Sequence, residues 1–382
     1  MVFVTDHVFY RYNNDIYSNK FSLETLNRYT NVFDEITIIA RVKDVSNIDG
    51  VGLCSRANIK FEFMNSISSL KSFFGERKIV RNQIKKILLK HDSLIARVPS
   101  QLGYIAAELA EKNNMKFGLE VVGCTWEAHF YHSSLIAKIY SFYAYFKMKS
   151  IVKSSFYSLY VTDNFLQGRY PPKTNAKVTN VSNVELLNSD EELLQSRIKR
   201  INKKNKTTVY GSIGSLATNY KGIHLAIKAL SLCSFDYEYR ILGEGVYVNK
   251  YKKLAKDLNI SKKIKFEGII GEREKLFNWI DDLDVYLQPS LTEGLPRTLI
   301  EAMSRACPSI GSNSGGIPEL LMKEVIFKSK DYEALKNIIL KLADNSSLLE
   351  IHAINNFKKA KEYKKETLDS KRTQFWSDFK NF

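Results

Sequence analysis

Two glutamates, Glu293 and Glu301, lie on either side of a short turn that the sequence predicts. The apolar run at residues 284–287 predicts a buried parallel strand before the turn, and helical spacing begins at Thr298 after it. At 1.5 Å of rise per residue, the second glutamate lies roughly 7–8 Å further along, so the two carboxyl groups are too far apart to share a proton. We therefore expect them to contact different parts of one ligand, with the two oxygens of Glu301 accepting from a pair of hydroxyl groups.

The turn itself, Gly294-Leu295-Pro296-Arg297, has the residues of an anion site. Gly294 lets the backbone approach a ligand closely, and Pro296 suits the first helical position, where its missing N–H would be unpaired anyway. The N–H groups of the first helical turn, the helix dipole and the guanidinium of Arg297 would then hold a diphosphate. The simpler alternative is an exposed loop glutamate followed by a glutamate that the helix dipole stabilises.

Further motifs follow other predicted strands in the second half of the chain. Gly214-Ser215-Leu216 and Tyr220-Lys221-Gly222 come after the strand predicted at residues 207–213, and Leu242-Gly243-Glu244-Gly245 ends the next strand. Ligands of open α/β sheets bind beyond the carboxyl ends of the strands. A lone lysine at the start of a helix is usually a solvated charge, but Lys221 lies at this edge, so we expect it to contact a diphosphate.

These motifs resemble those of the retaining glycosyltransferases of family 4, which have the GT-B fold, and in particular members of the bacterial surface-polysaccharide type. The resemblance rests on Glu293 and Glu301 with seven residues between them, on Ala302-Met303, and on Gly315-Gly316-Ile317-Pro318-Glu319, which is similar to the family's G-G-I-P-E turn. The motifs follow in the family's order from about residue 207 to residue 362, whereas the first half of the chain is only weakly similar.

The resemblance implies a role for each residue at this edge. Glu293 is then the catalytic residue, facing the transferred sugar, and Glu301 binds the ribose of the nucleotide. The family normally has an arginine where this chain has Ser215, so one fixed positive charge is absent, and Arg297 could replace it. The donor-binding residues that the resemblance implies are Ser215, Lys221, Gly294, Leu295, Pro296, Arg297 and Glu301.

On the acceptor side, residues 120–127 occupy the place where many members of the family carry a strand that ends in a histidine. That histidine is absent here, and Trp126, Glu127 and His129 could line the acceptor pocket instead. His129 and His132 form an H-x-x-H pair, but two histidines without a third ligand are more often ordinary polar side chains than a metal site. The resemblance agrees, since GT-B enzymes generally neutralise the leaving diphosphate with side chains and helix ends, so we expect neither metal nor cofactor.

Apolar runs alternate with helical stretches along both halves of the chain, which is the pattern of doubly wound parallel sheets. We expect two Rossmann-like α/β domains facing a central cleft: an acceptor-side domain at residues 1–184 and a donor-binding domain at residues 185–364. The C-terminal helix, residues 365–382, would cross back onto the first domain, as the resemblance implies, or else remain a helix of the second. The family's first strand usually leads into a Gly-Gly loop, but residues 6–20 contain no glycine.

The composition excludes several classes of protein. The chain has 382 residues, 44% of them hydrophobic, which is enough for two large cores. Its four cysteines are dispersed, which argues against a zinc site or a disulfide scaffold and favours a reducing compartment. Neither a secretory signal nor an apolar run of about 18 residues is present, so we expect a cytoplasmic protein. The formal net charge of +16 suits binding to phosphorylated substrates or to an anionic membrane surface, or it reflects composition bias. Binding to nucleic acid is a weaker alternative, since the sequence has no compact basic arm.

One helical stretch, residues 135–153, is both aromatic and basic. The sequence has no acidic residue from position 128 to 162, and Lys138, Lys149 and Lys153 fall within about 60° of one another on a helix. Two interpretations remain open. The stretch is either a helix packed on the first sheet or a helix in an anionic membrane interface, where it would bring a lipid-linked glycan to the protein. In the second case the protein would be peripheral on the inner face of the plasma membrane.

Residues and resemblance together predict a retaining glycosyltransferase that moves a hexose or hexosamine from a nucleotide diphosphate sugar to an acceptor hydroxyl. The product would be capsule, O-antigen or another surface glycan. Two alternatives use the same fold: a sugar-nucleotide epimerase or hydrolase, which needs no acceptor, and a non-catalytic relative that binds sugar nucleotides. The nucleotide, the sugar, the acceptor, the linkage and the oligomeric state do not follow from the sequence.

Overall fold

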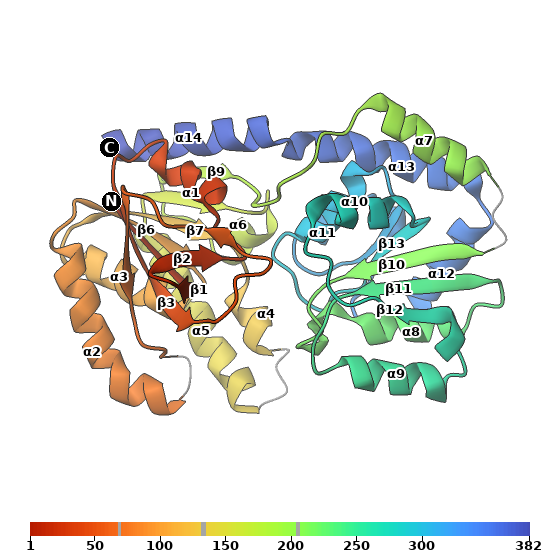
Figure 1. The fold of residues 1–382 in the computed structure, drawn as a ribbon, viewed down its shortest axis with the longest axis horizontal. Coiled ribbons are helices and arrows are strands. Elements are labelled where there is room, and N and C mark those ends of the chain that lie inside the picture. Colours follow the sequence, from red (N-terminus) through yellow and green to blue (C-terminus); the bar gives the residue numbers. More distant parts are fainter. Residues whose placement is uncertain (68–69, 131–134, 204–206) are drawn as a thin grey trace. The chain divides into compact units, whose positions relative to one another are not determined.

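The computed structural model describes residues 1–67, 70–130, 135–203 and 207–382. The chain divides into two compact units. The first contains Met1–Val181 and Leu368–Phe382, and the second contains Ser182–Thr367 (Figure 1). The division after Val181 lies three residues before the boundary that we expected after residue 184.

The first unit is built on a sheet with β1 (Val2–Tyr12) near its middle. Seven parallel strands follow in the order β5-β3-β1-β6-β7-β8-β9. Their bounds are β3 (Ile36–Asp44), β5 (Ile59–Phe63), β6 (Ser93–Val98), β7 (Lys116–Val121), β8 (Tyr157–Tyr160) and β9 (Lys177–Asn180). The helices are α1 (Leu23–Thr30), α2 (Leu70–Leu88), α3 (Gln101–Lys112), α4 (Thr125–Phe130), α5 (Leu135–Ser154) and α6 (Phe165–Arg169).

The glycine-free stretch after residue 5 forms a β-hairpin. Strand β1 continues to Tyr12 and returns antiparallel as β2 (Asp15–Ser18), which pairs in turn with β4 (Gly52–Leu53). The two loop residues, Asn13 and Asn14, both have positive φ, 47° and 69°, as a tight two-residue hairpin loop requires. Asparagine tolerates this conformation, so the chain turns here without glycine.

The last helix, α14 (Lys365–Asn381), packs on the first unit (Figure 1). Trp376 is fully buried, and its ring lies so close to Gly118 of β7 that a Cβ there would be 2.8 Å from the ring. The rings of Phe375 and Phe379 contact Tyr157 of β8. Residues 368–382 therefore complete the core of the first unit, although they follow the second unit in the sequence.

The second unit has six parallel strands in the order β12-β11-β10-β13-β14-β15. The strand order reverses between β10 (Thr208–Ile213) and β13 (Val285–Gln288), and such a switch point is where open α/β sheets bind ligands. The other strands are β11 (Tyr237–Leu242), β12 (Ile264–Phe266), β14 (Ser309–Ser312) and β15 (Ile326–Phe327). The α-helices are α7 (Glu191–Asn202), α8 (Ile223–Ser231), α9 (Val248–Asp257), α10 (Arg273–Asp281), α11 (Arg297–Ser304), α12 (Tyr332–Ala343) and α13 (Ser346–Ala360). Short 3₁₀ turns are Asn219–Lys221, Ser261–Lys263, Ile317–Glu319, Lys323–Val325 and Lys361–Tyr363.

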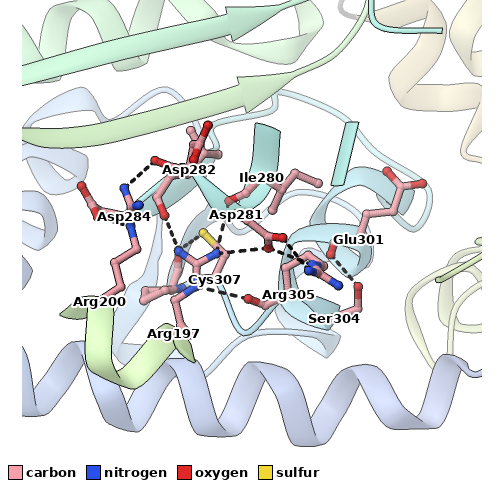
Figure 2. A network of polar contacts seen from close by, with 12 residues as sticks. Arg197, Arg200, Ile280, Asp281, Asp282, Asp284, Glu301, Ser304, Arg305 and Cys307 are labelled. Atoms are coloured by element: carbon pink, nitrogen blue, oxygen red, sulfur yellow. Dashed lines mark hydrogen bonds and ion pairs between the residues drawn. The ribbon is translucent and has the colours of Figure 1, made fainter. Parts of the chain in front are cut away.

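A buried arginine fixes α7 to the amino-terminal edge of this sheet (Figure 2). Arg197 is only 4% exposed and donates hydrogen bonds to three backbone carbonyl groups, those of Ile280, Leu283 and Arg305. Arg305 in turn pairs with Asp281, with 2.8 Å between Nε and Oδ1. This network holds the edge of the sheet opposite to the one that carries the predicted site.

Within the described ranges, no helix combines the length and the apolar composition that a membrane span requires.

Candidate functional site

The predicted donor-side residues all lie at the carboxyl-terminal edge of the second unit's sheet. The loop after β10 carries Ser215 and Lys221, the loop after β13 carries residues 293–296, and helix α11 carries Arg297 and Glu301. Because β10 and β13 are neighbours and parallel, their carboxyl ends meet at the same edge. Residues some 70 positions apart in the sequence are thereby brought into contact.

Glu293 is held at this edge through one of its carboxylate oxygens. Its Oε1 accepts hydrogen bonds from Lys221 Nζ at 2.6 Å, from Ser290 Oγ at 2.8 Å and from Gln288 Nε2 at 2.9 Å. The side chains of Lys221 and Glu293 are 15% and 10% exposed, so their ion pair is largely buried. The sequence predicted separate contacts for these two residues with one ligand, but in the structure they contact each other.

Two glycines allow Lys221 to reach Glu293. The lysine side chain crosses Gly214, where an added Cβ would lie 2.9 Å from the lysine's methylene carbons. Gly222 has φ of +70°, and a Cβ there would lie 1.8 Å from the carbonyl oxygen of Pro289. The loop after β10 therefore packs backbone to backbone on the loop after β13, which keeps the ion pair in place.

The glycine pair after β14 supports the Glu293 loop from the other side. Gly315 has φ of +58°, and a Cβ there would lie 2.1 Å from the carbonyl oxygen of Glu293. The next residue, Gly316, donates its N–H to the carbonyl oxygen of Gly294 at 2.7 Å. The G-G-I-P-E turn thus fixes the position of the peptide between Glu293 and Gly294.

Helix α11 begins at Arg297, one residue before the predicted helical spacing and one after Pro296, which we expected at the first helical position. Pro296 is its N-cap, with φ of −73° and ψ of 109°, and Arg297 is the first helical residue. The N–H groups of Arg297 and the two residues after it have no carbonyl partner within the helix. Arg297 itself is exposed. The start of α11 therefore presents a guanidinium and N–H groups that are unpaired within the helix, at the same edge as Lys221, which is the chemistry of an anion site.

Glu301 lies half-buried in the second turn of α11. No described residue donates a hydrogen bond to its carboxylate, and Figure 2 shows the side chain pointing away from the Arg305 network. Burial raises the pKa of Glu301, an effect that Arg297 and Arg273 partly oppose. A half-buried carboxylate that no described residue contacts by a hydrogen bond is suited to accept from the hydroxyl groups of a ligand.

The remaining donor-side prediction, Ser215, is exposed, and its Oγ accepts a hydrogen bond from the N–H of Ala217 at 3.3 Å. The loop that carries it is packed against the turn after β11. Gly243 has φ of +146°, and a Cβ there would lie 1.9 Å from the carbonyl oxygen of Gly214. Ser215 therefore presents a neutral hydroxyl from a well-supported loop, in the place of the arginine that the family normally has.

Comparison with known proteins identifies the family. Residues 195–364 match the family model described as glycosyl transferases group 1. The chain is 32% identical to protein CapJ of Staphylococcus aureus over 385 aligned positions, which cover 100% of this chain and 95% of CapJ. The chain belongs to the group 1 glycosyl transferases. The amylovoran biosynthesis glycosyltransferase AmsK of Erwinia amylovora is 31% identical over 142 residues, 34% of this chain and 35% of AmsK.

The solved structures confirm the predicted fold. HepE of Anabaena, solved in complex with UDP and glucose, superimposes with a TM-score of 0.68 at 14% identity, covering 100% of this chain and 99% of HepE. The glycosyltransferase thus has the GT-B fold, with two α/β units built on mainly parallel sheets. The resemblance inferred from Glu293, Glu301 and the glycine-rich turns is therefore correct at the level of family, fold and enzyme class.

The acceptor-side predictions lie in the first unit of the glycosyltransferase, on helix α4. The ring of Trp126 stacks on Phe130 and makes an edge contact with Phe142. Glu127 pairs with Arg169, with 3.4 Å between Oε1 and the guanidinium. His129 belongs to the same helix, but its side chain and the whole of His132 lie outside the described residues.

The described part of the glycosyltransferase contains no group of three or more histidine, cysteine, aspartate or glutamate side chains arranged to hold a metal ion. Its four cysteines are buried and free.

Sequence reasoning gave no role to Gln288 and Ser290, which the structure places against Glu293. Both are buried, at 2% and 0% exposure. A signal was present: Gln288 is a polar residue at the end of the otherwise apolar strand β13, and a buried amide needs a hydrogen-bond partner. The partner, however, depends on how the loop after β13 folds back.

Proposed function

We propose that this glycosyltransferase moves a hexose or hexosamine from a nucleotide diphosphate sugar to an acceptor hydroxyl, with retention of configuration. One observation carries the proposal: Lys221 and Glu293 meet at 2.6 Å beside the start of α11. Glu301, without a partner among the described residues, lies on the same helix. The solved complex of HepE with UDP and glucose supports a nucleotide sugar as donor in a protein of the same fold.

Each residue has a separate part in the proposed reaction. Lys221, Arg297, the hydroxyl of Ser215 and the N–H groups of Gly294, Leu295 and Arg297 hold the diphosphate. Glu301 accepts hydrogen bonds from the ribose. Glu293 faces the sugar. The bond between the anomeric carbon and the diphosphate oxygen breaks with its electron pair leaving on the diphosphate. The acceptor oxygen forms the new bond to the anomeric carbon, and its proton passes to the departing diphosphate oxygen. Fixed cations and N–H groups stabilise the charge that develops on the departing diphosphate.

The proposed reaction needs neither a metal ion nor an organic cofactor. In this account the side chains of Lys221 and Arg297 and the start of α11 supply the positive potential that a divalent cation supplies in other transferases. Transfer should therefore continue in excess chelator, and a complete loss that Mg²⁺ or Mn²⁺ reverses would refute this part of the proposal.

We propose a surface polysaccharide or its lipid-linked precursor as the acceptor. The similarity to the amylovoran biosynthesis glycosyltransferase AmsK supports a polysaccharide product. The acceptor-side residues would be Trp126, Glu127 and His129 of α4. The aromatic ring of Trp126 suits the apolar face of a sugar, and the carboxylate of Glu127 suits its hydroxyl groups.

We also propose that helix α5 docks on an anionic membrane. One face of α5 packs in the first unit, where Lys147 pairs with Glu108 at 3.1 Å. The other face exposes four apolar or aromatic side chains by half or more: Ile139, Phe142, Tyr143 and Phe146. Lys138 and Lys153 are exposed at its two ends, and Lys149 lies half-buried between them. Aromatic residues flanked by lysines suit the headgroup region of an anionic bilayer, at about 1 kcal/mol per basic residue.

Co-sedimentation with vesicles tests the docking. Binding should require anionic lipid, weaken with salt, and fall when Lys138, Lys149 and Lys153 become glutamine. The matched control changes Lys250, Lys252 and Lys253 of α9 to glutamine, which removes the same charge from another helix and should leave binding intact. Equal recovery with neutral and anionic vesicles, or equal losses in the two variants, would argue for a non-specific charge effect or for packing alone.

A panel of nucleotide sugars, assayed with and without a glycan acceptor, tests the proposed reaction. Release of the nucleoside diphosphate should depend on the acceptor and on Glu293. Full turnover without any acceptor would instead favour a hydrolase or epimerase. Binding of a nucleotide sugar without turnover in any condition would favour a non-catalytic relative.

A further inference from the structure

Gln288 lies beneath the proposed catalytic carboxylate. It is the last residue of β13 and is 2% exposed. Its side-chain nitrogen donates to Glu293 Oε1 at 2.9 Å and to Ser290 Oγ at 2.8 Å. Ser290, which is fully buried, donates its own hydroxyl to the same Oε1 at 2.8 Å. Gln288 therefore contacts Glu293 directly and also through Ser290.

The orientation of the Gln288 amide is fixed by groups behind it. Its oxygen accepts a hydrogen bond from the hydroxyl of Tyr286 at 3.0 Å and a longer one from Thr298 at 3.4 Å. Tyr286 is fully buried, and burial raises the pKa of its hydroxyl, so that this group remains a donor. With the amide oxygen occupied, the amide nitrogen must face Glu293 and Ser290.

This arrangement treats the two oxygens of Glu293 differently. Oε1 has three donors, namely Lys221, Ser290 and Gln288. None of the described residues donates to Oε2. A carboxylate fixed through one oxygen cannot rotate freely about its last bond, and its second oxygen keeps its full capacity to accept from or stabilise a ligand.

We infer that Gln288 is a positioning residue for the transfer reaction, which holds Glu293 by Oε1 and thereby leaves Oε2 for the sugar. The inference rests on the proposed role of Glu293. Lys221 is the third donor, but a bound diphosphate would draw it away. Gln288 and Ser290 are neutral, so the charge of the diphosphate does not attract them as it attracts the lysine. They therefore keep their hydrogen bonds to Glu293 when the donor is bound.

Two nearly isosteric substitutions separate this role from simple packing. Gln288→Glu keeps the shape but removes the donor and adds a second carboxyl group about 2.9 Å from Glu293. Gln288→Met keeps the approximate volume and removes both polar atoms. Two adjacent carboxyl groups hold a proton to higher pH than one alone. The Glu variant should therefore shift the acidic limb of the pH–rate profile upward, which a packing defect would not do.

The experiment compares Gln288→Glu and Gln288→Met with wild type and with Ser309→Ala. Ser309 is similarly buried in the neighbouring strand β14, and its hydroxyl donates to the carbonyl oxygen of Cys307, away from Glu293. The measurements are Tm, the Kd of UDP or GDP, whichever the wild type binds, and kcat and KM for the donor across pH. We expect a loss of at least tenfold in kcat for both Gln288 variants, with Kd within threefold and with the pH shift confined to Gln288→Glu. Ser309→Ala should match the wild type.

An unchanged kcat in either folded variant would overturn the inference. A lower kcat that is accompanied by weaker nucleotide binding and a lower Tm would also overturn it. If Gln288→Glu does not fold, the split between kcat and Kd in Gln288→Met decides the question. Glu293→Gln distinguishes a failure of the proposed catalytic role of Glu293 from a failure of the positioning role of Gln288. Full turnover in that variant would refute the proposed role of Glu293 itself, whereas a loss there without a loss in the Gln288 variants would refute only the positioning role.

Discussion

Replacing Lys221 by methionine tests the central contact of the site. The substitution keeps most of the side-chain volume and removes the ammonium group from the 2.6 Å ion pair with Glu293. Surface ion pairs contribute about 0–1 kcal/mol, and breaking a fully buried one costs about 3–5 kcal/mol. With 15% and 10% exposure, this pair lies between the two cases. We expect Lys221→Met to lower the free energy of unfolding by about 1–3 kcal/mol.

The effect on ligand binding follows from the same contact. A hydrogen bond to a charged group contributes about 1.5–3 kcal/mol, which corresponds to a loss of roughly 10- to 150-fold in affinity. In the free protein, however, Lys221 is already paired with Glu293, so a diphosphate replaces one anionic partner by another. We therefore expect the lower end of the range, about tenfold, for a nucleoside diphosphate. Glu293→Gln removes the competing anion and should leave that affinity unchanged or raise it.

Calorimetric titration with UDP and with uridine, or with the guanosine pair if the protein prefers it, measures the effect. Lys221→Met should weaken binding of the diphosphate and leave binding of the nucleoside unchanged, because only the former carries the phosphates. Lys252→Met, an exposed lysine on α9, is the control and should bind both as the wild type does. Wild-type affinity for the diphosphate in Lys221→Met, or equal losses for diphosphate and nucleoside, would refute the assignment.

Three further outcomes are expected. Glu301→Ala should weaken nucleoside diphosphate binding. Burial raises the pKa of Glu301, so the ionised carboxylate destabilises the folded state above the ordinary glutamate pKa. Glu301→Gln should therefore raise Tm at pH 7–8. Thermal scans at lower pH should show this gain disappearing below the ordinary glutamate pKa, where the carboxyl group is protonated. Gly315→Ala should lower the free energy of unfolding by about 1–2 kcal/mol from the left-handed backbone alone, and should reduce turnover by moving Glu293. Its control, Gly271→Ala, lies at a position with open space and should match the wild type in denaturation and activity assays.

Much of the second unit could be predicted from the sequence because its strands are buried on both faces. Runs such as residues 284–287 stand out against polar loops, and the order of motifs along the chain places their loops at one edge. The ion pair between Lys221 and Glu293 could not be predicted in the same way. It depends on Gly214 and Gly222 allowing two loops to pack backbone to backbone, which is a three-dimensional property that residue spacing does not contain.

The hairpin of the first unit was not predicted. Asn13-Asn14 is a turn signal, but for residues 6–20 we noted only that the glycines of the family's loop are absent, and we assigned no structure to the stretch. The start of α11 differed from the prediction by a single residue at Pro296, within the usual uncertainty of helix ends. Local residue chemistry was a better guide than resemblance at residues 6–20, where this chain departs from its family.

The arrangement of the donors on Glu293 bears on the order of events in the reaction. In the free protein the charge of Glu293 is balanced by Lys221, and the phosphate loop has Ser215 in place of an arginine. An arriving diphosphate would therefore compete for the lysine and expose the carboxylate charge to the sugar only when the donor is bound. Gln288 and Ser290 are neutral donors that a diphosphate does not attract, so they can keep the carboxylate in position during that exchange. A single ion pair would thus couple occupation of the phosphate site to the negative potential at the anomeric carbon.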